Sequence, residues 1–132
     1  MKNITLPDNL PARVQFDTDS NVLYVTYHGE LAPGIITQVS KFVAGCDFFT
    51  KNINTLIDYS QSSIKTDVEA TMAFLEYIQS IANQIGHPKW AIISGSELNS
   101  AMLRRLIFLT ENLPIEMKEF ETKEEALQWL QA

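Results

Sequence analysis

The stretch TLIDYSQSSIKTDVE, residues 55–69, carries the signals that decide the fold. Its first five residues form a short apolar run of the kind that makes a buried strand. The six residues that follow, 60–65, are mostly short polar side chains, which predict a loop. Thr66 with Glu69 three residues later is a capping box, which predicts a helix from Thr66 to about Ile85. The segment is therefore predicted to be a strand, a hydroxyl-rich loop and a long helix.

The segments on either side continue the alternation of strand and helix. Alternating apolar residues at 13–17 and 22–27, with turn-forming residues between them, predict an N-terminal hairpin. The remaining elements are a helix from about Pro33, a strand at 90–93, a helix over 97–112, a strand at 115–120 and a helix after Thr122. The order β-β-α-β-α-β-α-β-α predicts an α/β fold with a mixed five-stranded sheet and four helices. Because no linker or repeat divides them, residues 1–132 are interpreted as a single domain.

The composition argues against nucleic acid and membrane-spanning segments. The chain carries a net charge of −6, which repels phosphate backbones. The adjacent pair Arg104 and Arg105 is interpreted as the solvated face of a helix. No apolar run resembles a signal peptide or approaches the ~20 residues that span a bilayer. Together with a single cysteine, Cys46, which cannot form an internal disulfide, this predicts a cytoplasmic protein.

Three short features mark the chain from about Arg13 to Leu130. They are the opening hairpin, Leu56-Ile57-Asp58 before the hydroxyl-rich loop and long helix, and the closing pattern Phe120-(x)5-Ala126-Leu127-Gln128-Trp129-Leu130. This combination resembles the STAS-like domains related to bacterial anti-sigma factor antagonists, and within them the SpoIIAA-like family. The resemblance implies a regulatory module, in which phosphorylation of a serine or threonine at the start of the second helix breaks a partner complex. Some relatives are instead compared with lipid-carrying Sec14-type domains.

Polar residues at two strand ends form the first candidate site, for a protein partner or a phosphate. Open α/β sheets bind ligands at the carboxyl ends of parallel strands, and here these ends carry Asp58, Ser60, Ser62, Ser63, Thr66, Ser94 and Ser96. The chain has Asp58-Tyr59-Ser60-Gln61-Ser62-Ser63 in place of the Asp-Ser-Ser-Gly-like signature of phosphorylated antagonists, so no single hydroxyl is assigned as the target. A phosphate on Ser62 or Ser63 would lie near the free N–H groups of the second helix. The alternative is ordinary turn and cap chemistry, with Thr66 and Ser96 as helix caps.

The second candidate site is apolar surface on the two long helices. The predicted core stripe of the second helix consists of Val68, Met72, Leu75, Ile78, Ala82 and Ile85. Phe74, Tyr77 and Ile81 widen this arc to roughly 200°, more than docking on one sheet requires. The third helix adds Met102 and Phe108. Three interpretations stay open: contact between helices within the fold, a homodimer interface, and the wall of an apolar ligand pocket.

The sequence offers no catalytic or metal-binding pattern. His28 and His87 stand apart from other ligand-type residues at metal spacing, and no nucleophile elbow or cofactor fingerprint is present. We therefore predict a non-enzymatic protein without metal or cofactor, with a regulatory or protein-interaction function. The alternative prediction is a carrier or sensor of a hydrophobic small molecule or lipid. The predicted partner is accordingly a protein, such a small molecule or, in a homodimer, a second copy of the chain.

Overall fold

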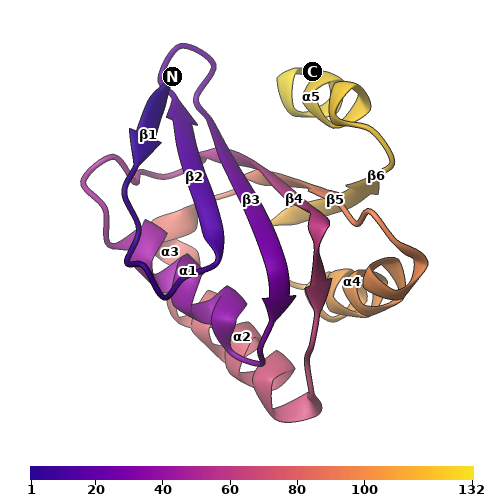
Figure 1. The fold of residues 1–132 in the computed structure, drawn as a ribbon. Coiled ribbons are helices and arrows are strands. Elements are labelled where there is room, and N and C mark those ends of the chain that lie inside the picture. The colour runs from indigo at the N-terminus through magenta and orange to yellow at the C-terminus, as the bar shows by residue number, and fades with distance from the viewer.

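A mixed sheet of six strands organises the molecule, and the computed structural model describes all 132 residues. The strands lie in the sheet in the order in which they occur in the chain (Figure 1). They are β1 (Lys2–Ile4), β2 (Ala12–Asp17), β3 (Val22–Leu31), β4 (Asn54–Ile64), β5 (Lys89–Ile93) and β6 (Glu116–Phe120). The first three pair antiparallel, and β3 to β6 pair parallel. The predicted α/β class and hairpin are confirmed.

The sequence predicted five strands, and the additional strand is β1. Its three residues pair with β2, so that Lys2 lies opposite Phe16 and Ile4 opposite Val14. A segment of three residues with one half-buried side chain is too short to show the alternation by which a strand is identified. It forms because the edge of β2 offers unpaired backbone groups that another strand can satisfy.

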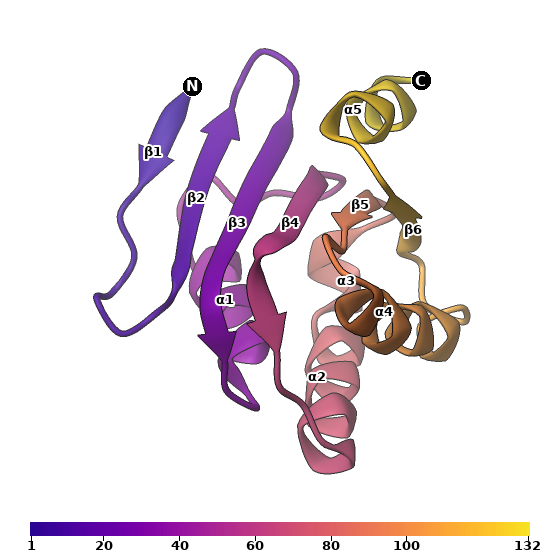
Figure 2. The same ribbon diagram turned by 45° about the vertical axis from the view of Figure 1, so that its right-hand side comes forward.

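Helices cover both faces of the sheet. They are α1 (Ile35–Ala44), α2 (Val68–Ser80), α3 (Ala82–Ile85), α4 (Glu97–Leu109) and α5 (Lys123–Gln131). Val39 of α1 and Leu103 of α4 join the main core cluster with residues of β2 to β5, while α2 and α3 pack beside it. Only α5 packs on the opposite face, through Ala126 and Leu130 (Figure 2).

The long second helix predicted from the sequence is divided into two helices, α2 and α3. The residue that caps α2 also differs from the predicted one. α2 ends before Ile81, whose φ of −109° and ψ of 11° separate it from the short α3. The cap of α2 is Asp67 and not Thr66, because the Asp67 carboxylate accepts a hydrogen bond from the Ala70 amide at 2.7 Å. A carboxylate at this position also interacts favourably with the helix dipole, which explains why Asp67 is preferred.

The caps predicted for the other two helices are confirmed. The Ser96 hydroxyl accepts a hydrogen bond from the Asn99 amide at 3.1 Å at the start of α4. The Thr122 hydroxyl accepts one from the Glu125 amide at 3.2 Å at the start of α5. α4 ends at Leu109, three residues earlier than predicted.

The hydroxyl-rich segment is the second half of a strand, and the predicted loop is wrong. β4 continues to Ile64 because β3 runs beside it as far as Leu31 and supplies backbone partners. A bulge sets two residues of β4, Tyr59 and Ser60, opposite Tyr27 of β3. Beyond this bulge β4 has passed its last pair with β5, so its other edge has no neighbouring strand.

Candidate functional site

One buried side chain, Asn99 of α4, takes the place of a strand beside the end of β4. Its Nδ2 donates to the carbonyl oxygens of Tyr59, Ser62 and Ser94 at 3.3, 3.0 and 3.0 Å. Its Oδ1 accepts from the Ile64 amide at 3.1 Å. Asn99 is 2% exposed, so it satisfies these backbone groups away from water. The four hydrogen bonds fix the position at which the chain leaves β4 for α2.

A cleft of about 510 Å³ opens where β3 and β4 end, between α2 and α4. Its lining includes Ile64 at the end of β4 and Ile36 of α1. Met72 projects from α2 and Met102 from α4 into the lining. Eleven of the 18 lining residues are hydrophobic, so the walls suit an apolar molecule.

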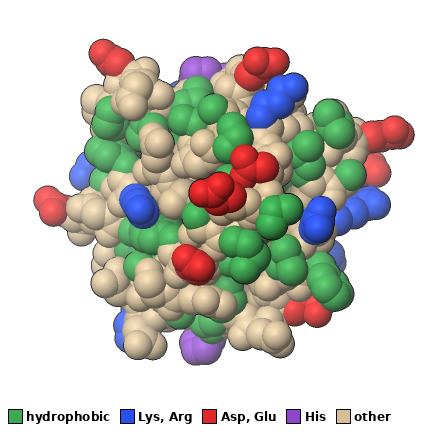
Figure 3. All heavy atoms as spheres, turned by 90° about the horizontal axis from the view of Figure 1, so that it is seen from below, with side chains coloured by type: hydrophobic (Ala, Val, Ile, Leu, Met, Phe, Trp, Pro, Cys, Tyr) green, Lys and Arg blue, Asp and Glu red, His purple; other side chains and the backbone are tan.

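Apolar side chains remain exposed along the two helices beside the cleft. Val68 is 70% exposed, Met72 48% and Leu109 43%. The predicted core stripe is therefore wrong at Val68 and Met72, and Phe74, which is 7% exposed, takes a core position instead. The reason is that α2 extends past the sheet at its N-terminal end, where the cleft separates it from α4. Figure 3 views the molecule from this end and shows apolar side chains exposed between charged ones.

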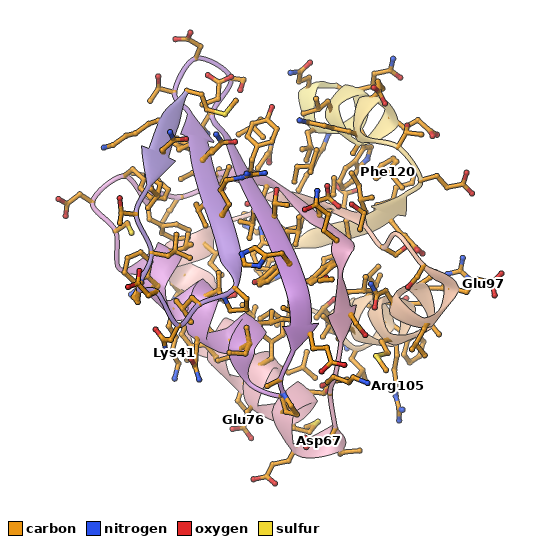
Figure 4. The ribbon with its side chains drawn as sticks, in the orientation of Figure 1. Lys41, Asp67, Glu76, Glu97, Arg105 and Phe120 are labelled. Carbon is orange, nitrogen blue, oxygen red and sulfur yellow. The ribbon has the colours of Figure 1, made fainter.

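The rim of the cleft carries two basic side chains, Lys65 and Arg105, that have no carboxylate partner. The neighbouring Arg104, by contrast, forms the one ion pair of the structure, from its Nε to Glu119 Oε1 at 3.1 Å. Asp67 also lines the cleft, but its carboxylate is hydrogen-bonded to the first turn of α2. In Figure 4, Arg105 points from α4 toward the end of the molecule where Asp67 begins α2. In a chain of net charge −6, this rim is a local site that favours an anionic group.

A second, smaller space of about 70 Å³, named the inner cavity, lies beside the cleft, between the sheet and the helices α1 to α3, and it is not closed off from the surface. Of its 21 lining residues, 19 are hydrophobic. Ile36, Phe74 and Leu106 line both the inner cavity and the cleft. The two spaces therefore share lining side chains from three different helices.

Two stacked tyrosines, Tyr27 of β3 and Tyr59 of β4, line the inner cavity. Their ring centroids are 5.0 Å apart, the rings are parallel, and each residue is 2% exposed. Burial raises the pKa of both phenols, and for Tyr27 the nearby Tyr59 raises the pKa further. Both groups are therefore neutral hydrogen-bond donors at neutral pH.

Of the polar residues predicted as a site, only Thr66 lies in the cleft. The others lie on β4 or in the turn after β5: Asp58, Ser60, Ser62, Ser63, Ser94 and Ser96. Gly95 brings these two segments together so closely that a Cβ at this position would overlap Ser60. The two polar segments therefore meet, as expected, but outside the cleft. They do not form the N-terminus of α2, because Asp67 occupies that position.

The apolar residues predicted as a site lie in different places. Phe74 and Met102 line the cleft, and Phe74 and Ile81 line the inner cavity. Tyr77 is half-buried and packs against the core cluster of α2 and α3. Phe108 is 67% exposed on α4 and lies outside both spaces.

Sequence reasoning missed the two basic residues of the rim. Lys65 belongs to the segment that the sequence assigns to a loop, and Arg105 is one half of a pair that the sequence explains as a solvated face. The difference between Arg105 and Arg104 arises from Glu119 of β6, which is distant along the chain. Burial raises the pKa of the Glu119 carboxyl, but hydrogen bonds from Ser100, Ser94 and Arg104 outweigh this effect and lower the pKa.

No family model and no curated protein matches this chain. Among solved structures, it is similar to an uncharacterized protein of the DUF3478 family with a SpoIIAA-like fold from Shewanella loihica PV-4. The two sequences are 23% identical, and the structures superpose with a TM-score of 0.62. The alignment covers 96% of this chain and 99% of the other.

The fold of this chain is therefore SpoIIAA-like, which confirms the STAS-like architecture predicted from the sequence. No cluster of three or more His, Cys, Asp or Glu side chains is arranged to hold a metal ion. None of the helices has the length and apolar character that crossing a bilayer requires.

Proposed function

We propose that this protein binds an amphiphilic small molecule, with its apolar chain in the cleft between α2 and α4 and its anionic group at the rim. The supporting observation is a cleft of about 510 Å³ with mostly apolar walls and two unpaired basic side chains, Lys65 and Arg105. Apolar pockets of roughly 300–1,000 Å³ with few polar groups are the usual sites of small molecules. A bound alkyl chain would also cover Met72 and Leu109, which are otherwise exposed.

The geometry gives less support to a phosphoserine switch on β4. The Ser62 hydroxyl already donates to the Tyr59 carbonyl at 2.9 Å. Ser63 lies opposite Glu30 of β3, so a phosphate there would add negative charge beside a carboxylate. The N-terminus of α2, which could hold a phosphate, is capped by Asp67. The regulatory and protein-interaction function stays a prediction from the sequence.

Calorimetric titration with straight-chain acids, from octanoate to hexadecanoate, tests the proposal. We expect binding of at least one acid, and Arg105→Gln should weaken it about fivefold to tenfold, which corresponds to roughly 1 kcal/mol at an exposed rim. Arg104→Gln is the matched control, because this guanidinium is engaged by Glu119 and should leave binding unchanged. Met102→Trp should abolish binding of the acids, because the larger side chain would fill the cleft. The proposal is wrong if no acid binds, or if both arginine variants weaken binding equally.

A further inference from the structure

Two of the four methionines of the chain, Met72 of α2 and Met102 of α4, line the cleft. Met72 is 48% exposed although its side chain is apolar, and Met102 is half-buried. The thioether sulfur of an accessible methionine reacts with peroxides, which convert it to a sulfoxide. Both helices beside the cleft therefore present oxidisable sulfur atoms in the walls that the proposed ligand chain would contact.

The other sulfur atoms of the chain lie outside the cleft. Met1 is 69% exposed at the N-terminus and does not belong to the lining. Met117 of β6 is half-buried, and its sulfur accepts a hydrogen bond from the Thr110 hydroxyl at 3.5 Å. Burial raises the pKa of the Cys46 thiol, which lowers the fraction of the thiolate that reacts with peroxides. The two cleft methionines are therefore the only residues that place sulfur in this site.

Oxidation would make the cleft wall polar. An alkyl chain that covers a sulfoxide removes its oxygen from water without supplying a hydrogen bond, which costs free energy. Met102 lies three residues before Arg105 on α4, and both line the cleft, so the two side chains are neighbours on this helix. A sulfoxide oxygen at Met102 would compete for the guanidinium that is proposed to pair with the anionic group of the ligand. Both effects weaken ligand binding.

We propose, building on the proposed function, that Met72 and Met102 form a reversible oxidation site that controls the binding of apolar molecules in the cleft. A peroxide transfers one oxygen atom to each thioether sulfur. The O–O bond breaks, the sulfur is oxidised to a sulfoxide, and hydrogen peroxide is reduced to water. A methionine sulfoxide reductase reverses the step with two thiols, which are oxidised to a disulfide while the oxygen leaves as water. The oxidised protein has the lower affinity.

Mass spectrometry of peptides after graded treatment with hydrogen peroxide shows which sulfur atoms are oxidised. We expect oxidation first at Met1 and Met72, then at Met102, and last at Met117, because the Met117 sulfur is half-buried and hydrogen-bonded. Methionine sulfoxide reductase with dithiothreitol should restore both cleft methionines. The site is refuted if Met117 is oxidised before Met72 and Met102, or if the reductase leaves their sulfoxides unchanged.

Calorimetric titration with the same straight-chain acids, before and after peroxide treatment, measures the effect on binding. The wild-type protein should lose about tenfold in affinity and regain it after reduction. The matched control is the double variant Met72→Leu, Met102→Leu, which nearly conserves the volume of both side chains. It retains Cys46, Met1 and Met117, so its affinity should be the same before and after treatment. An equal loss in this variant would assign the effect to another residue and would refute the site.

A parallel measurement with Nile red, a neutral dye that fluoresces in apolar surroundings, separates this proposal from the proposed function. The dye carries no anionic group, so its binding depends on the apolar walls and not on Lys65 or Arg105. If the acids do not bind, but oxidation dims the dye in the wild type and not in the leucine variant, the proposed function fails and the oxidation site stands. If oxidation changes the dye signal of neither protein, or of both alike, the oxidation site is refuted whatever the acids do.

Discussion

Replacing Asn99 with alanine should destabilise the protein strongly, because this side chain holds the free edge of β4. The substitution removes the acceptor of the Ile64 amide and the donor of the Tyr59, Ser62 and Ser94 carbonyls. A buried group left without a partner costs about 1–3 kcal/mol. The Tyr59 carbonyl retains the hydrogen bond from the Ser62 hydroxyl, so not all four groups are lost in full. We expect a loss of about 3–5 kcal/mol from a total of ~10 kcal/mol.

Urea unfolding followed by tryptophan fluorescence measures this loss as a shift of the midpoint at constant slope. Gln79→Ala, an exposed substitution on α2, is the control and should change the free energy of unfolding by less than about 0.5 kcal/mol. Hydrogen exchange should quicken first at the Ile64 amide. A loss below about 1 kcal/mol for Asn99→Ala would mean that water satisfies these groups, and would refute the idea that Asn99 replaces a strand.

Two further predictions concern the bulge and the tyrosine pair. Gly95→Ala should cost about 2–4 kcal/mol in urea unfolding, because the new Cβ would overlap Ser60 as well as strain a φ of 78°. Gly29→Ala is the control, because Gly29 has the same φ of 78° but open space around it, and it should cost only about 1 kcal/mol. If both substitutions lowered the free energy of unfolding equally, the close contact between Gly95 and Ser60 would not be the cause. Since burial raises the pKa of Tyr27 and Tyr59 above the ordinary value of about 10, the stability they contribute is complete below that pH and is lost as the pH rises beyond it. The Tyr27→Phe, Tyr59→Phe variant should therefore lose less stability than the wild type between neutral pH and strongly alkaline pH, as measured by urea unfolding with tyrosinate absorbance.

Most of the fold could be predicted because its signals are local. The alternating residues of the hairpin and the caps at Ser96 and Thr122 depend on neighbours within three or four residues. The errors occur where distant segments supply the partners. The second half of β4 is polar like a loop, but it is a strand because β3 and Asn99 satisfy its backbone. β1 likewise exists only because β2 has a free edge.

The site was less predictable than the fold. The excess of apolar residues predicted on the helices that are α2 and α4 in the structure did indicate Phe74 and Met102, which line the cleft. The helical period, however, placed Val68 in the core, whereas Val68 is exposed in the structure. Which side of α2 is covered depends on how the sheet and α4 pack against it. The pairing state of Arg105 depends on the position of Glu119 in another strand. Such differences arise from tertiary packing, which helical spacing does not encode.

The extension of β4 also decides which function the geometry supports. A loop over residues 60–65 would have placed its hydroxyl groups at the N-terminus of α2, where free N–H groups bind phosphate. Because β4 continues to Ile64, the chain instead delivers Lys65 and Asp67 to this point. Asp67 occupies the helix N-terminus with its own carboxylate, and Lys65 contributes positive charge to the cleft. An anionic ligand is therefore expected to pair with side chains at the rim, so that its apolar chain points inward toward Phe74 and the inner cavity.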